Sequence, residues 1–375
     1  MKKKIGILTT YYASNYGAAL QPFALMKTLE SLGYDVDMLP YKQESICNAY
    51  NPLYYKKFFC YGFAKFVSSV LNLIYTLPRE WAFRDYIKKY VTSNRKLTKK
   101  VDPNKDVYFI GSDQLWKPFS PNMKFDDVYC GFFDTKKNAK KIAYAVSGEI
   151  ATLNQDEREY LCRAFDNFDM ISVREKIRAN QYSSFYKKKD FEIVADPTIL
   201  ADPKIYGSID TSKVHLAGEF VLFYCIRSGS IDFLEKINTY AQEKKCKLVI
   251  LSEGFNRDLL RYANGKINVK YYPRAGVDFF LVAVKNANAV FTASFHGNVF
   301  SILYHKNLHC LILNDGHDNR AKELLESLEI TNRFICIDSP ITDTVIDWDL
   351  VEMNLSKMRS KAMDFVQRAL SLIEC

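Results

Sequence analysis

Short apolar runs alternate with helical patterns along most of the chain. Residues 5–10 (IGILTT) form one apolar run, and apolar positions from Leu20 to Leu32 keep helical spacing until Gly33. A second apolar run, VDMLPY (36–41), follows. This order of strand, loop, helix and strand is the opening unit of a doubly wound α/β domain. The glycine-rich dinucleotide fingerprint is absent, so the unit carries no NAD signal.

The alternation continues and then starts afresh near Glu219. The first series of predicted strands lies in DVYFIGSDQLW, KIAYAVSGE, FDMISVRE and EIVADPTIL, and the second in EFVLFYCIRSG, KLVILSE, NAVFTASFHG and LHCLILN. Residues 202–218 are rich in turn-forming residues and read as a linker. We therefore predict two Rossmann-like domains that face each other across a cleft. The predicted limits are 1–205 and 216–345, with a C-terminal helix at about 347–375 that packs back on the first domain.

Residues 53–90 are the most apolar and aromatic segment. The apolar residues from Phe59 to Leu77 form one helical stripe, which is about long enough to span a bilayer. Lys65 near its middle favours an amphipathic helix instead. We expect this helix to pack against the first domain. The alternative is peripheral contact with the inner face of a membrane, aided by the flanking residues Lys56, Lys57, Arg79 and Arg84.

The net charge and the cysteine pattern limit the expected kinds of partner and the expected cellular compartment. The net charge of +9 favours anionic partners. We find no zinc finger, RNP motif or basic-region heptads, so nucleic acid is not an expected partner. The nine cysteines are odd in number and form no C-x-x-C pair, a pattern typical of a reducing compartment. The N-terminal apolar run is too short for a signal peptide, and we expect a cytoplasmic protein.

Polar residues follow five of the predicted strands directly. Ligands of open α/β sheets bind at the carboxyl ends of the strands, so these residues are the candidates for a site. They are Ser14-Asn15-Tyr16-Gly17, Gly111-Ser112-Asp113-Gln114, Ser147-Gly148-Glu149, Arg174 and Ser294-Phe295-His296-Gly297.

The last of these segments carries the strongest chemistry. A strand, then Ser-x-His-Gly, then a helix brings the His296 imidazole and free backbone amides together, which suits anion binding and proton transfer. Asp113 offers a carboxylate for a sugar hydroxyl or a proton relay. Arg174 fits a two-pronged clamp on a carboxylate or phosphate, although pairing with Glu175 is the simpler alternative. For Asn15 to Gly17 an ordinary turn is the simpler alternative.

Six motifs, taken in order, resemble those of the polysaccharide pyruvyl transferase family. They are SNYGAALQ (14–21), GSDQLW (111–116), YAVSGE (144–149), ISVRE (171–175), VADPTIL (194–200) and ANAVFTASFHGNVFSI (287–302). The resemblance extends from about residue 4 to 335. Val146 and Glu149 depart from the third motif. Residues 45–100 and the C-terminal helix carry no family signal and are expected to bear on the acceptor.

The resemblance implies a fold like that of GT-B glycosyltransferases and a reaction without a metal or another cofactor. It implies that phosphoenolpyruvate donates pyruvate to a sugar, expected to be galactose, as a ketal on two hydroxyls during surface-polysaccharide synthesis. His296 would then be the acid, Asp113 would orient or deprotonate the hydroxyl, and Arg174 would bind the donor; the roles of His296 and Asp113 are exchangeable. The expected substrate-binding residues are Asn15, Tyr16, Gly17, Ser112, Gln114, Ser147, Ser294, Phe295 and Gly297. Whether the glycan acceptor is lipid-linked stays open.

Two other functions fit the same pattern. A GT-B nucleotide-sugar glycosyltransferase would need a carboxylate for the donor ribose, for which Glu323, Glu326 and Glu329 are the candidates. A non-catalytic glycan-binding assembly factor would leave its candidate side chains scattered. For an enzyme we predict that Asp113 and Arg174 lie on one wall of the cleft and His296 on the other.

Overall fold

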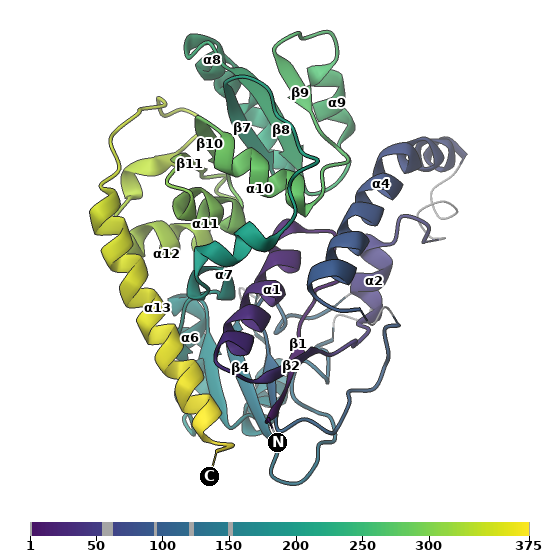
Figure 1. Ribbon diagram of the computed structural model, residues 1–375, viewed down its shortest axis with the longest axis vertical. Helices are drawn as coiled ribbons and strands as arrows, with labels where there is room; N and C mark the ends of the chain where they lie inside the picture. Colours follow the sequence, from purple (N-terminus) through teal and green to yellow (C-terminus); the bar gives the residue numbers. More distant parts are fainter. Residues whose placement is uncertain (1, 55–62, 94–95, 120–123, 149–152, 375) are drawn as a thin grey trace.

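The computed structural model describes residues 2–54, 63–93, 96–119, 124–148 and 153–374, and it contains two parallel β-sheets (Figure 1). The described strands form two six-stranded sheets, in the orders β2-β1-β3-β4-β5-β6 and β12-β11-β10-β7-β8-β9. In each sheet the first strand along the chain lies in the interior, as in a doubly wound domain. The predicted fold class, two Rossmann-like domains, is therefore confirmed.

The first sheet is formed by the N-terminal half of the chain. Its strands are β1 (Lys4–Leu8), β2 (Asp35–Met38), β3 (Val107–Ile110), β4 (Lys140–Val146), β5 (Met170–Val173) and β6 (Glu192–Ile193). The helices in this part are α1 (Tyr16–Ser31), α2 (Glu44–Tyr50), α4 (Phe63–Tyr90), α5 (Gln155–Asp166), α6 (Lys176–Phe185) and α7 (Pro197–Leu200). Every residue of β3 is buried, as expected for a parallel strand that helices cover on both faces.

The second sheet begins directly after the predicted linker, in which the short 3-10 helix η1 (Pro203–Ser208) forms. Its strands are β7 (Phe220–Cys225), β8 (Lys247–Ser252), β9 (Val269–Tyr271), β10 (Ala289–Thr292), β11 (Asn307–Leu311) and β12 (Phe334–Ile335). Its helices are α8 (Leu234–Glu243), α9 (Arg257–Ala263), α10 (Val277–Asn286), α11 (Phe295–Leu303) and α12 (Asn319–Ser327), with the 3-10 turns η2 (Ser228–Phe233) and η3 (Thr331–Arg333).

The first helix begins earlier than its apolar spacing predicts. It starts at Tyr16 rather than near Leu20, because the Asn15 side chain accepts a hydrogen bond from the Ala18 amide at 3.1 Å and caps the helix. Gly17 therefore belongs to the helix and not to a loop. The predicted end is correct: Gly33 adopts a left-handed conformation, with φ +94°, directly after the helix.

The C-terminal helix α13 (Trp348–Ser371) runs alongside the first domain (Figure 1). Arg368 forms an ion pair with Glu192 of β6 at 2.6 Å. The Arg359 Nε donates to the Ile199 carbonyl of α7 at 3.0 Å. The polypeptide thus returns to the first domain after completing the second.

Helix α4 does not pack as we expected over its described part. Val70 and Ile74 belong to the predicted apolar stripe, yet they are 43% and 61% exposed. Arg79, predicted as a flanking basic residue at the surface, is instead buried. No helix among the described residues is both long and apolar enough to cross a membrane. Phe59 lies outside the described residues, and membrane contact through this face stays a prediction.

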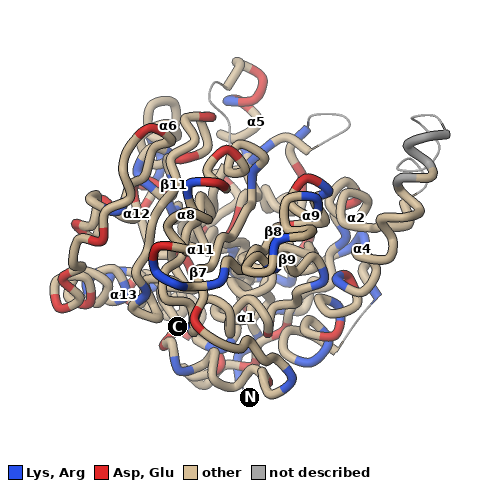
Figure 2. The backbone as a smooth tube through the Cα atoms, turned by 90° about the horizontal axis from the view of Figure 1, so that it is seen from above, with Lys and Arg blue, Asp and Glu red and all other residues tan. Residues whose placement is uncertain are grey.

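Acidic and basic positions are interspersed along the backbone (Figure 2). The titratable side chain of His309, by contrast, lies in the interior. His309 of β11 is fully buried and stacks on Phe291, with ring centroids 4.3 Å apart. Burial, reinforced by the nearby Arg333 charge, lowers the pKa of His309 to about 4, although Asp343 opposes this shift.

This buried histidine makes stability depend on pH. The unfolded chain binds a proton at His309 below about pH 6.5, whereas the folded chain does so only near pH 4, so the free energy of unfolding should fall as the pH drops between these values. The expected loss is about 3 kcal/mol. Urea unfolding at pH 7 and at pH 4.5 measures it. The variant His309→Phe should lose less stability over the same range, and an identical loss would contradict the assignment.

Candidate active site

A cavity of about 830 Å³ lies between the two domains, at the carboxyl ends of their strands. The segments after β1 and β3 supply its first wall, and the segments after β7, β8 and β10 supply the opposite wall. Its lining includes Asn15, Asp113, Gln114, Lys117, Arg227, Glu253, Ser294, Phe295, His296 and Arg320. The site therefore lies where open parallel sheets bind ligands.

His296 is held at the start of α11. Ser294 caps this helix, because its Oγ accepts a hydrogen bond from the Gly297 amide at 3.1 Å. The imidazole is packed against α1 of the other domain: a Cβ on Gly17 would lie 2.0 Å from the His296 Nδ1. Only glycine fits at position 17 with the ring in this place. His296 lines the cavity and is 8% exposed.

Asp196 connects His296 to the first domain. Its Oδ1 lies 3.6 Å from the His296 Nε2, and its Oδ2 accepts a hydrogen bond from the Arg174 Nη1 at 2.6 Å. Asp196 is 1% exposed and also caps α7 by accepting a hydrogen bond from the Thr198 amide. Burial opposes its charge, but His296 and Arg174 outweigh burial and hold its pKa far below the usual range. A permanent carboxylate thus lies beside the imidazole.

Arg174 occupies a buried position behind the cavity. Besides Asp196, its guanidinium pairs with Glu175 through Nε at 3.1 Å and lies 4.6 Å from the centre of the Phe295 ring. These carboxylates outweigh the effect of burial and raise the pKa of Arg174. The Nη2 group is buried and has no partner in the part of the chain that the structure describes. Arg174 lines a smaller cavity of about 260 Å³ rather than the large one, so the donor clamp stays a prediction.

Asp113 faces the large cavity from the first domain. It follows β3 in a left-handed conformation with φ +85°. Its Oδ1 accepts a hydrogen bond from the Gln114 amide at 2.8 Å. Burial opposes its charge, but Arg174 and His296 outweigh burial and lower the pKa of the carboxyl group. Asp113 is therefore an anion near neutral pH.

The remaining predicted substrate-binding residues fall into two groups. Asn15, Gln114, Ser294 and Phe295 line the cavity. Five others do not line it and are instead buried in structural contacts: Tyr16, Gly17, Ser112, Ser147 and Gly297.

The contacts of the second group show why these residues are buried. The Tyr16 hydroxyl donates to the Ala275 carbonyl at 3.1 Å and thereby joins the two domains. Ser112 donates to the Ala145 carbonyl at 2.8 Å, and Ser147 donates to Glu175 at 2.8 Å. A Cβ on Gly297 would lie 2.8 Å from Thr292. Their role is to hold the site in shape. Glu149 lies outside the described residues.

Three side chains of the site were not among the predicted residues. Asp196 lies in the quoted motif VADPTIL, but an Asp before Pro also reads as a plain helix cap. Arg227 follows β7 and pairs with Asp318 at 2.6 Å and with Asp315. Glu253 directly follows β8, and a polar residue at the carboxyl end of a strand is the sequence signal that marks it. In the described part of the chain, no group of three His, Cys, Asp or Glu side chains is placed to hold a metal ion.

Solved structures share the fold. UDP-GlcNAc 2-epimerase from Methanocaldococcus jannaschii aligns with a TM-score of 0.52 at 12% identity, over 99% of each chain. MurG from Acinetobacter baumannii aligns with a TM-score of 0.43 at 11% identity, also over 99% of each chain. The epimerase likeness supports two Rossmann-like domains of the GT-B type and, at this identity, says nothing about chemistry.

Sequence comparison identifies the family of the chain, which the solved structures do not. No curated protein matches the chain by sequence. The model of the family described as polysaccharide pyruvyl transferase matches residues 15–315, a range that extends into both domains and includes Asp113, Asp196 and His296. The expected family resemblance is thereby confirmed, and the chain belongs to the polysaccharide pyruvyl transferase family.

Proposed function

We propose that the protein transfers the pyruvyl group of phosphoenolpyruvate to two hydroxyls of a sugar, as a ketal, with a galactoside as the expected acceptor. One observation carries this proposal beyond family membership. The buried Asp196 carboxylate of the first domain contacts both Arg174 and His296, and His296 lines a cavity that Asp113 lines from the first domain. An imidazole, two carboxylates and a guanidinium therefore converge from two domains.

The proposed reaction needs one proton to begin. Protonation of the donor's methylene carbon leaves a methyl group and a positive, oxygen-stabilised carbon that bears the phosphate. The first sugar hydroxyl attacks this carbon and releases its proton. The second hydroxyl then attacks the same carbon, the bond between this carbon and the phosphate oxygen breaks, and the proton of the second hydroxyl passes to the departing phosphate. The products are the ketal and inorganic phosphate, and the proton used at the start is returned.

The geometry suggests a role for each side chain. We assign the first proton to His296, because imidazole exchanges protons near neutral pH and the Asp196 anion stabilises a positive charge on the ring. The lowered pKa of Asp113 makes it a weak base. We therefore assign to Asp113 the orientation of the attacking hydroxyl through an accepted hydrogen bond. Lys117 and Arg320 line the same cavity and contribute positive potential for an anionic donor.

The two alternative functions find less support. Glu323, a candidate ribose ligand for a nucleotide-sugar glycosyltransferase, instead accepts hydrogen bonds from the Lys176 and Ile177 amides at 2.7 and 3.2 Å and caps α6. A non-catalytic assembly factor predicts side chains that do not converge, whereas Asp196 touches both Arg174 and His296. The transferase is the function that the arrangement favours.

Phosphate release tests the proposal. The protein is incubated with phosphoenolpyruvate and a panel of galactosides, and inorganic phosphate is measured over time. We expect release that requires both substrates and saturates with each. Release without any sugar, at the same rate, would indicate a phosphatase, and no release with any acceptor would contradict the proposal.

A further inference from the structure

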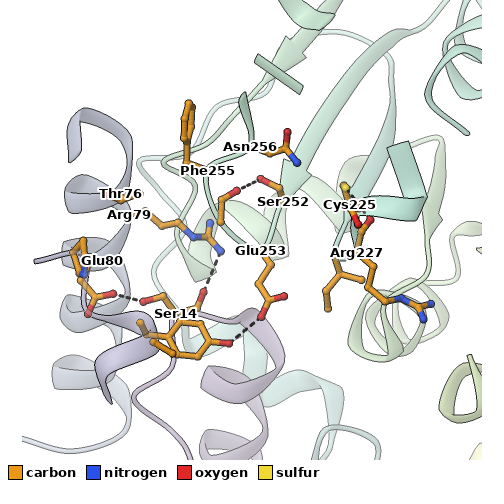
Figure 3. Close-up of a pocket in the computed structure, with 16 residues that line it drawn as sticks. Ser14, Thr76, Arg79, Glu80, Cys225, Arg227, Ser252, Glu253, Phe255 and Asn256 are labelled. Carbon is orange, nitrogen blue, oxygen red and sulfur yellow. Dashed lines mark hydrogen bonds between the residues drawn. The ribbon is translucent and has the colours of Figure 1, made fainter. Parts of the chain in front are cut away.

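A second chamber of about 450 Å³ adjoins the large cavity (Figure 3). Helix α4 supplies one side of it, with Thr76 and Glu80, and the segment after β8 supplies the other. Tyr50, Arg227 and Glu253 line both spaces, so the two are separated by a shared wall.

Glu253 is fixed at this wall with one oxygen still available. Its Oε1 accepts hydrogen bonds from the Asn15 Nδ2 and from the Tyr50 hydroxyl, both at 2.9 Å. Its Oε2 accepts none from the residues that the structure describes. These two contacts come from α2 and from the cap of α1, and they hold the carboxylate at the boundary of the chamber (Figure 3). A ligand hydroxyl could donate to Oε2 without any rearrangement.

Asn256 offers the opposite hydrogen-bonding capacity. Its Oδ1 is used to cap α9, since it accepts from the Asp258 and Leu259 amides at 2.9 and 3.1 Å. The amide Nδ2 has no hydrogen-bond acceptor among the described residues. Phe255 lies between these two polar residues in sequence and stacks on Tyr75 with ring centroids 4.5 Å apart. The chamber thus combines a fixed acceptor, an available donor and a rigid aromatic surface.

The charged groups of the chamber argue against an anionic ligand. Arg79 donates to the Tyr16 hydroxyl and the Ala275 carbonyl at 2.9 and 2.7 Å. Arg227 pairs with Asp315 and Asp318. The Nη groups of both guanidiniums are therefore engaged, and the Arg79 Nε is buried without a partner among the described residues. The Glu253 carboxylate lines the space and would repel an anion. This lining suits a neutral molecule that carries several hydroxyls.

We propose that this chamber is the acceptor subsite and binds a neutral sugar ring. Glu253 accepts a hydrogen bond from one ring hydroxyl, Asn256 donates to another, and the apolar face of the ring lies against Phe255. The shared wall at Glu253 directs the reacting hydroxyls toward Asp113 and His296. Naming the ligand an acceptor rests on the proposed function, whereas the binding of a neutral sugar does not.

Two isosteric substitutions test the subsite. Glu253→Gln keeps an acceptor for Asn15 and Tyr50 but replaces Oε2 by a donor, and Asn256→Asp keeps the helix cap but removes the donor. The control is Glu235→Gln, the same change at an exposed side chain that pairs with Lys266. Saturation-transfer NMR with methyl β-galactoside, methyl α-glucoside and methyl α-mannoside measures binding directly, and phosphate release measures the acceptor KM.

We expect both chamber variants to bind the glycoside about tenfold more weakly, the effect of one lost hydrogen bond to a charged or oriented group. The affinity for phosphoenolpyruvate should not fall in either chamber variant. The control Glu235→Gln should bind both the glycoside and phosphoenolpyruvate as the wild type does. Thr76→Phe fills the chamber from α4 and should abolish sugar binding. This variant tests the subsite independently if Glu253→Gln disturbs the fold. Thermal unfolding followed by circular dichroism checks the fold of each variant.

The two proposals fail in different ways. Wild-type protein that binds a glycoside through Glu253 and Asn256 but releases no phosphate supports the subsite and contradicts the transferase. Phosphate release with an acceptor KM that none of the three chamber variants changes overturns the subsite and leaves the transferase standing. The absence of saturation transfer to every glycoside also overturns the subsite.

Discussion

Replacement of His296 by alanine should lower the rate constant of pyruvyl transfer by about two to four orders of magnitude, the usual contribution of a general acid. The imidazole lines the cavity, and its Nε2 lies 3.6 Å from the Asp196 carboxylate. Because the donor's carboxylate and phosphate do not depend on this proton, the KM for phosphoenolpyruvate should change far less. Steady-state kinetics with the preferred galactoside separate the two quantities.

His305→Ala is the matched control for this experiment. His305 belongs to the same domain and forms an ion pair with Glu352 at 2.8 Å, but it lies at the surface and outside the cavity. Its loss should leave the rate within about twofold, because His305 does not line the cavity. The fold should also be little affected, because exposed ion pairs contribute at most about 1 kcal/mol to stability. A loss of less than tenfold for His296→Ala would remove this residue from the chemistry.

Asp196→Asn should destabilise the fold by about 3 kcal/mol and also reduce activity. The substitution keeps an oxygen for the cap of α7 but removes the charge that faces Arg174 at 2.6 Å. The guanidinium is then left buried with Glu175 as its remaining carboxylate partner. Breaking a buried pair is costly because the surviving charge is no longer compensated. Urea unfolding at pH 7 gives the change in free energy.

The neighbouring Asp202→Asn separates this charge effect from capping. Asp202 caps η1 by accepting a hydrogen bond from the Lys204 amide at 2.9 Å, but it is exposed and pairs with no cation in the described chain. Asparagine caps as well as aspartate does, so its stability should change by about 0.5 kcal/mol or less. Equal effects of the two substitutions would show that Asp196 matters only as a cap.

The fold and the ligand-binding edge of each sheet can be predicted from the sequence, because both depend on local patterns. Apolar runs bounded by polar segments mark the strands, and polar residues directly after them mark the edge where ligands bind. Asp113 and His296 were found in this way, and both line the cavity. In a parallel sheet the carboxyl ends of all strands lie at the same edge. Residues that follow the strands can therefore be placed at this edge without knowledge of long-range contacts.

The contacts between the domains could not be predicted by the same route. Asp196 and His296 are far apart in sequence and meet only when the two sheets are docked. Gly17 looked like a loop glycine, yet it is helical and is required by the imidazole that packs against it. Arg79 looked like a surface cation beside an apolar stripe, yet it is buried and joins α4 to the second domain. Local periodicity contains no information about such docking.

The fate of the donor's methylene group tests the central claim most directly. The protein is incubated in deuterium oxide with a galactoside and phosphoenolpyruvate labelled with carbon-13 at the carbon that bears the phosphate. We expect the label in a quaternary ketal carbon bonded to two sugar oxygens, beside a methyl group that carries one deuterium. A labelled product that keeps its methylene double bond, or label that ends in free pyruvate in place of a sugar ketal, would contradict pyruvyl transfer by this protein.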